Sequence, residues 1–125
     1  MSEEILKALR DSTKGLFYPS ETDSPFEVVC WRAGGELNAE NLEILTRPKS
    51  SRKARKVVQV TLENFFAELT DSEDSAKFKN LQTILADMLS NTSVFRMGIV
   101  KVDIYIVGEN GASDWIGLHT LSVET

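Results

Sequence analysis

The residues best suited to nucleophilic chemistry are the single cysteine and the single histidine, Cys30 and His119. A cysteine activated by a histidine is a common nucleophile, and the pair would define a small enzyme if both side chains lined one cleft. Cys30 lies in the apolar run VVCW, where a free cysteine is usually a small buried hydrophobe. His119 lies in a strand-like segment on the same face as Leu121 and Val123, which is typical of a structural residue. The sequence therefore favours a protein that is not an enzyme.

Metal and phosphate sites are not indicated by the sequence. One cysteine and one histidine cannot supply a disulfide within the chain or a four-ligand Cys/His zinc site. The acidic stretch TDSED lacks the glycine and the distal glutamate of a calcium loop. The pair Gly34-Gly35 lacks the following Lys-Ser/Thr of a phosphate loop. We therefore expect no cofactor and no metal ion of the protein's own.

The charged residues divide the chain into a basic segment and an acidic remainder. The segment RPKSSRKARK, residues 47–56, holds six of the 14 Lys and Arg residues and no acid. The net charge of the chain is −5, so the remainder, with 8 basic and 19 acidic residues, carries −11. The basic segment has no aromatic residue on which a base could stack, and we interpret it as a solvated loop. An acidic remainder repels nucleic acid and attracts basic protein surfaces, so we expect no nucleic-acid partner.

The length and composition predict a single domain over residues 1–125. A chain of 125 residues with 42% hydrophobic residues can build a real core. The N-terminal MSEEILKALRD has neither the basic region nor the long apolar run of a signal peptide. No stretch approaches the roughly 18 apolar residues of a membrane span. We expect a soluble protein of a reducing compartment, without a membrane partner.

Helical and strand-like patterns alternate along the chain. A helix is predicted over residues 2–14, and Gly15 closes it. A second helix is predicted over NAENLEIL, with Asn38 as its N-cap, and a third is predicted to begin after the N-cap Thr61. A fourth helix is predicted over residues 75–89. FEVVCWR is predicted to be a strand buried on both faces, KVVQV is predicted to be a further strand, and FYPSETDSP is predicted to be a loop.

Two further strands are predicted towards the C-terminus. FRMGIVKVDIYIVG is expected to be one strand that bends or bulges near Gly98. WIGLHTLSV is expected to pair with it as an antiparallel hairpin, because Asn110-Gly111 between them is a turn signal. The elements predict a layered α/β or α+β domain in which helices cover a mostly antiparallel sheet. The last strand would then carry Glu124 and Thr125 out from the sheet edge on a rigid mount.

Several stretches together resemble the nuclease A inhibitors, a family of small cytoplasmic bacterial proteins that block a sugar-non-specific, magnesium-dependent endonuclease. The stretches are EILKALRDSTKGLFYPSETDSPFEVVCW, FKNLQTIL, FRMGIVKVDIYIVGENGAS and GLHTLSVET. The most specific pieces are SE shortly before PFEV, DIYIVGE, and the terminal VET. The resemblance implies a cytoplasmic, non-enzymatic inhibitor. It also implies an α+β fold, a PR-1-like three-layer α-β-α sandwich around a mostly antiparallel sheet.

The resemblance also implies where a partner binds. In the family the C-terminal threonine enters the nuclease active site and approaches the catalytic magnesium, and Thr125 matches it. A glutamate in the loop before the first strand meets a basic residue of the active site, and Glu21 matches it. We therefore expect Thr125, Glu124 and Glu21 to bind a non-specific DNA/RNA endonuclease, one inhibitor per nuclease, with the C-terminal Glu-Thr plugging its active site.

The chain departs from the family pattern at two places. The acidic loop before the long helix, LTDSEDSAK here, is shorter and lacks a contacting tryptophan, and SSRKARK is more basic than the family pattern. An acidic interaction module of the same fold, with a partner that is not a nuclease, is the alternative to nuclease inhibition. A small enzyme that uses Cys30 or His119 ranks last.

Overall fold

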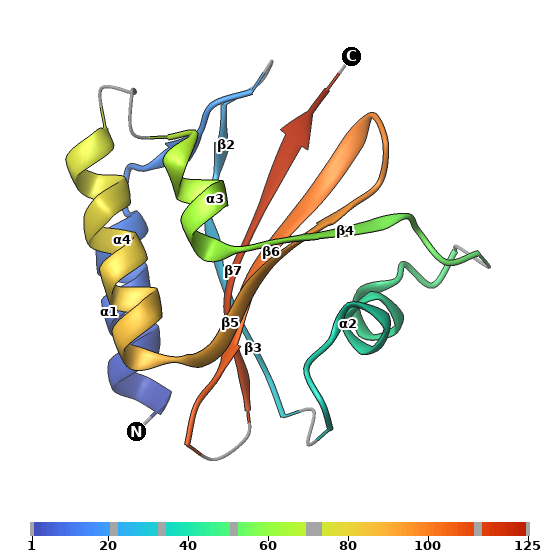
Figure 1. Ribbon diagram of the computed structural model, residues 1–125, viewed down its shortest axis with the longest axis horizontal. Coiled ribbons are helices and arrows are strands. Elements are labelled where there is room, and N and C mark those ends of the chain that lie inside the picture. Colours follow the sequence, from blue (N-terminus) through green and yellow to red (C-terminus); the bar gives the residue numbers. More distant parts are fainter. Residues whose placement is uncertain are drawn as a thin grey trace.

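The protein is described by a computed structural model that covers residues 2–20, 23–32, 35–50, 53–69, 74–111 and 114–124 (Figure 1). Within these ranges it has four helices, a five-stranded antiparallel sheet and a two-stranded sheet. The predicted mixed class with an antiparallel sheet is therefore confirmed. No helix in the same ranges is both long enough and apolar enough to cross a membrane.

The helices and strands of the described residues have the following bounds. The helices are α1 (Ser2–Thr13), α2 (Ala39–Thr46), α3 (Leu62–Ala67) and α4 (Ser75–Met88). The large sheet contains β3 (Glu27–Trp31), β4 (Val57–Val60), β5 (Ser90–Met97), β6 (Lys101–Glu109) and β7 (Trp115–Val123). The small sheet contains β1 (Phe17–Tyr18) and β2 (Ser24–Pro25). The strand order of the large sheet is β3-β7-β6-β5-β4.

Helices cover both faces of the large sheet, with α1, α3 and α4 on one face and α2 on the other (Figure 1). The alternation of side chains along β6 explains why both faces of the sheet are covered. Val102, Ile104 and Ile106 enter the core beneath α1, α3 and α4. Tyr105 and Val107 enter a second, smaller core on the face that α2 covers. A strand with apolar side chains on both faces must be covered on both faces, and β6 lies in the middle of the sheet.

Three predicted helix boundaries are confirmed. Gly15, two residues beyond α1, has a φ of +73°, the left-handed conformation that commonly ends a helix. The side chain of Asn38 accepts a hydrogen bond from the Asn41 N–H at 2.8 Å and caps α2. Thr61 caps α3 in the same way, with its hydroxyl 3.1 Å from the Asn64 nitrogen.

The prediction that the strand around Cys30 is buried on both faces is wrong. β3 lies at the edge of the large sheet, and its residues are exposed or half-buried. Cys30 itself is exposed. An apolar sequence alone cannot distinguish an edge strand from a central one, because the difference is the number of neighbouring strands. The prediction of a loop for FYPSETDSP is also incomplete, since β1 and β2 lie at its ends.

The prediction of one bent strand around Gly98 is wrong as well. The chain reverses there, and β5 and β6 pair as a hairpin with Met97 opposite Asp103. Gly98 has a φ of +118°, and a Cβ at this position would lie 2.4 Å from the carbonyl oxygen of Lys101. The reversal therefore requires glycine.

The predicted hairpin of the last two strands is confirmed. β6 and β7 pair without interruption from Lys101 opposite Val123 to Glu109 opposite Trp115. The turn signal Asn110-Gly111 follows β6 directly, and the Asn110 N–H donates to the Asp114 carbonyl at 3.1 Å. The last strand is thus held along its whole length by a central strand.

Candidate partner-binding site at the end of the last strand

The C-terminal part of β7 lies between β6 and the segment that precedes β3. β3 pairs only with residues 115–119 of β7, so residues 120–123 have no β3 residue beside them. The Thr120 hydroxyl there donates to the Pro25 carbonyl at 3.0 Å, and the Val123 N–H donates to the Ser20 hydroxyl at 3.3 Å. These two bonds tie both ends of the segment 20–25 to the end of β7.

Two of the three predicted partner-binding residues, Glu21 and Thr125, lie outside the described residues, as do Arg52 and residues 70–73 of the acidic stretch. Ser20 directly precedes Glu21, and Glu124 directly precedes Thr125. The hydrogen bond between Ser20 and Val123 joins positions 103 residues apart in the sequence. The structure therefore brings together the described residues that flank the two predicted contacts.

Glu124, the third predicted residue, is anchored by its backbone and by its side chain. Its N–H donates to the Val100 carbonyl at 2.8 Å. Its carboxylate oxygen Oε2 accepts a hydrogen bond from the Ser122 hydroxyl at 2.9 Å and forms an ion pair with Arg96. About 45% of the side chain remains exposed. The chain is thus held in a defined direction at its last described residue.

Arg96 was not among the residues predicted from the sequence. It lies on β5, and its side chain is 22% exposed. Burial lowers the pKa of its guanidinium, but the hydrogen bond with Tyr18 and the charge of Glu124 together raise that pKa above its usual value. Arg96 therefore places a permanent positive charge beside the Glu124 carboxylate. Nothing local in FRMG indicates this role, because Glu124 is 28 residues away.

Two depressions flank the Glu124–Arg96 ion pair. The larger, about 560 Å³, lies between α3, β4 and the end of β7. The smaller, about 210 Å³, lies towards the β5–β6 turn and is lined by Val58, Ile99 and Lys56 among others. Glu124, Arg96 and Val58 line both depressions. The end of β7 is therefore at the rim of a concave surface.

Cys30 and His119 do not line a common cleft. In the register of β3 and β7, Cys30 is opposite Ile116, whereas His119 is opposite Glu27. Positions three apart on a strand point to opposite faces, so the two side chains lie on opposite sides of the sheet. Partial burial and the charge of Asp114 raise the pKa of the Cys30 thiol, which favours the unreactive protonated form.

His119 instead contacts an acidic and an aromatic side chain of the neighbouring strand β6. Its Nε2 lies 2.9 Å from Oδ1 of Asp103, and its ring lies 4.6 Å from the ring of Tyr105. Asp103 also contacts Arg55 at 3.4 Å, so the histidine belongs to a network that crosses the sheet face beneath α2. In the part of the chain that the structure describes, no three His, Cys, Asp or Glu side chains lie close enough together to hold a metal ion.

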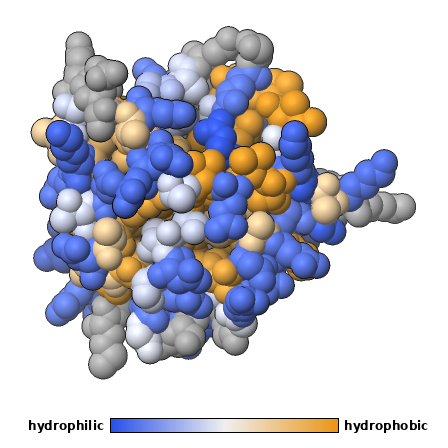
Figure 2. Space-filling model, viewed as in Figure 1, coloured by the Kyte–Doolittle hydropathy of each residue, from blue (hydrophilic) through white to orange (hydrophobic). Residues whose placement is uncertain are grey.

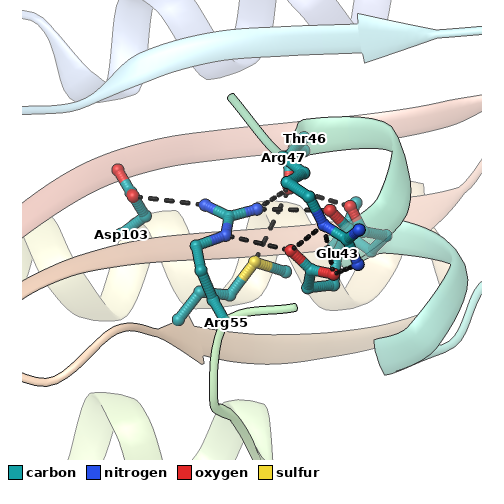
Figure 3. A network of polar contacts seen from close by, with 7 residues as sticks. Glu43, Thr46, Arg47, Arg55 and Asp103 are labelled. Atoms are coloured by element: carbon teal, nitrogen blue, oxygen red, sulfur yellow. Dashed lines mark hydrogen bonds and ion pairs between the residues drawn. The ribbon is translucent and has the colours of Figure 1, made fainter. Parts of the chain in front are cut away.

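That network centres on Glu43 of α2 (Figure 3). Glu43 is buried, and its carboxylate accepts hydrogen bonds from Nε of Arg47 at 3.0 and 3.1 Å and from Nε of Arg55 at 3.1 Å. Arg55 also donates to the Thr46 hydroxyl at 2.7 Å. The hydrogen bond from Arg47, opposed by burial and assisted by Arg55, lowers the pKa of Glu43 to about 2.

The interpretation of residues 47–56 as a solvated loop is therefore wrong for Arg55. Its side chain is only 15% exposed, and it connects α2 to Asp103 on β6. The physical reason is that the carboxylate of Glu43 needs buried cationic partners, and the basic segment supplies them. Lys53 and Lys56 in the same segment are exposed.

The fold and the site together define a mixed α/β protein in which Glu124, after the last strand, is anchored at the rim of a depression, a geometry suited to contact with another macromolecule. The chain belongs to the nuclease A inhibitor-like protein family (NuiA), which matches residues 3–125. The resemblance noted in the sequence is thus confirmed, and it points to a nuclease as the protein partner. No curated protein matches the chain.

Proposed function

We propose that this protein inhibits a sugar-non-specific, magnesium-dependent DNA/RNA endonuclease by inserting Glu124 and Thr125 into its active site. One observation carries the proposal: the hydrogen bond between Ser20 and the Val123 N–H. It joins the residue before Glu21 to the strand that leads to Thr125. A single partner surface could then meet both residues at once.

The chemistry of the partner explains why such an end would inhibit it. A nuclease that ignores base identity holds the phosphate backbone in a basic cleft, next to its metal ion. A threonine hydroxyl and a terminal carboxylate are hard oxygen donors, the ligands that Mg²⁺ prefers. The end of the chain would therefore imitate a phosphodiester. Glu21 would pair with a basic residue of the same cleft.

Within this mechanism, Glu124 acts mainly by directing Thr125. Its carboxylate is engaged by Arg96 and Ser122, and its N–H by Val100. Because its backbone is already held, Glu124 has little conformational freedom left to lose on binding, and preorganisation of this kind favours affinity. A free, unanchored tail would lose more entropy in the same contact.

The test is an inhibition assay with a purified sugar-non-specific, magnesium-dependent endonuclease. Deletion of Thr125, or addition of two glycines after it, should weaken inhibition by about 100-fold or more, the scale of a lost desolvated charge contact. Neither change touches the core, so the melting temperature should stay the same. Two glycines added before Met1 are the matched control, since the N-terminus lies at the other end of the molecule (Figure 1).

Full inhibition by the protein with the two C-terminal glycines would refute the plug. Absence of binding between the folded wild type and the nuclease would favour the alternative, an acidic interaction module with a different protein partner. The PR-1-like type of the sandwich, the single domain over residues 1–125, the cytoplasmic location and the 1:1 stoichiometry stay predictions of the same proposal.

A further inference from the structure

The turn between β5 and β6 presents apolar side chains to solvent. Ile99 is 76% exposed and Val100 is 52% exposed, and Val58 on the adjacent strand β4 is 47% exposed. Figure 2 shows apolar surface at the outer end of the β5–β6 hairpin. Turn positions usually carry polar residues or glycine, so an exposed Ile-Val pair has no local explanation. In the described structure, neither residue belongs to the two apolar cores.

This apolar turn is in direct contact with the end of the chain. The carbonyl of Val100 accepts the Glu124 N–H at 2.8 Å. Val58, Ile99 and Glu124 line the same depression of about 210 Å³. A partner that covers the end of β7 must therefore come close to the turn.

The turn is also held in place by the sheet. The Gly98 N–H donates to the Lys56 carbonyl at 3.0 Å, and Val57 of β4 is opposite Met97 of β5. Gly98 has a φ of +118°, and a Cβ there would lie 2.4 Å from the Lys101 carbonyl oxygen, so the reversal is tight. The apolar side chains are consequently presented outwards by a rigid element.

We propose that Ile99, Val100 and Val58 form an apolar contact for the nuclease surface that surrounds its active-site cleft. The inference rests on the proposed function. The occupant follows from continuity, since the same partner reaches the adjacent chain end. Its surface here should be apolar or aromatic, because burying exposed Ile and Val against such a surface is favourable. The acidic charges would then govern association, and the apolar turn would slow dissociation.

The experiment measures association and dissociation rate constants by surface plasmon resonance on an immobilised, sugar-non-specific, magnesium-dependent endonuclease. Ile99→Ser should raise the dissociation rate constant by about 10-fold or more, the scale of losing one buried Ile side chain. Val58→Thr, which keeps the β-branched shape, should raise it in the same direction. Ile99→Leu should keep the wild-type rate. Ile44→Ser is the matched control, since Ile44 is 58% exposed on α2, on the other side of the sheet.

Thermal melting accompanies each variant and should show no change, because all of these side chains are largely exposed. If the wild type binds the nuclease and Ile99→Ser and Val58→Thr dissociate no faster than Ile44→Ser, the apolar contact is refuted and the proposed function stands. If the wild type binds no nuclease at all, both are refuted. An equal increase for Ile99→Ser and Ile44→Ser would also overturn the contact, since it would not be local to the turn.

Discussion

Replacement of Glu43 by glutamine should destabilise the fold by about 3 kcal/mol. The Glu43 side chain is 4% exposed, and its partners Arg47 and Arg55 are 27% and 15% exposed. Glutamine keeps the volume but removes the negative charge that both guanidinium groups share at Glu43. Removal of one partner of a buried ion pair costs about 3–5 kcal/mol. We expect the lower end, because Arg47 is partly solvated and Arg55 keeps Thr46 and Asp103 as partners.

The assay is urea denaturation of the wild type and the Glu43→Gln variant near neutral pH, with the free energy of unfolding as the measured quantity. Lys77→Ala is the control. Its ion pair with Asp74, at 3.7 Å, joins side chains that are 60% and 43% exposed, and such surface pairs contribute at most about 1 kcal/mol. If Glu43→Gln also costs less than about 1 kcal/mol, the network beneath α2 contributes little to the stability of the fold.

The same variant has a pH signature whose sign follows from the pKa. In the folded protein the pKa of Glu43 is lowered from 4.5 to about 2. Its stabilising effect is therefore complete above about pH 4.5 and is lost as the pH falls towards 2. The difference in unfolding free energy between wild type and Glu43→Gln should accordingly shrink over this range. A difference that stays constant from neutral pH down to about 2 would contradict the assignment.

Three other predictions concern the turn, the loop and the charge. Gly98→Ala should lower the free energy of unfolding by about 1–3 kcal/mol, because φ is +118° and the new Cβ would meet the Lys101 carbonyl oxygen. Urea denaturation measures this change, and an unchanged unfolding midpoint would show that alanine causes no backbone strain at this position. Glu21→Ala should weaken the free energy of binding to the nuclease by about 2–5 kcal/mol, measured from the inhibition constant, without changing the melting temperature. An unfolded variant, or unaltered inhibition, would show that Glu21 does not contact the nuclease. Association with the nuclease should slow as salt rises, because −11 of charge lies outside residues 47–56; a rate constant independent of salt would exclude electrostatic steering.

Features that depend on near neighbours could be read from the sequence. The N-caps Asn38 and Thr61 bond to N–H groups three residues on, and Gly15 ends its helix by its own backbone conformation. The hairpin of the last two strands was also predictable, since Asn110-Gly111 lies between two strand-like runs. In each case the interacting groups are separated by a few residues, so the local pattern contains the whole signal.

The β5–β6 reversal shows where local patterns fail. Apolar residues continue through Gly98, Ile99 and Val100, so the sequence resembles one strand with a bend. The pairing of β5 with both β4 and β6 determines that the chain reverses there. The apolar pair that misled the prediction is the same pair that the structure leaves exposed beside the chain end. An exposed apolar turn can therefore resemble a strand interior in the sequence, because both are apolar.

By itself the sequence determined the family, the types of most elements and the separation of a basic segment from an acidic remainder. Only the tertiary structure decided which charges are buried and which distant residues meet. Arg96 reaches Glu124 across 28 residues, Arg55 reaches Asp103 across 48, and Ser20 reaches Val123 across 103. The physical reason is that a side-chain period specifies the face on which a residue lies, whereas its neighbours on that face depend on strand order and register, which form between segments far apart in the chain.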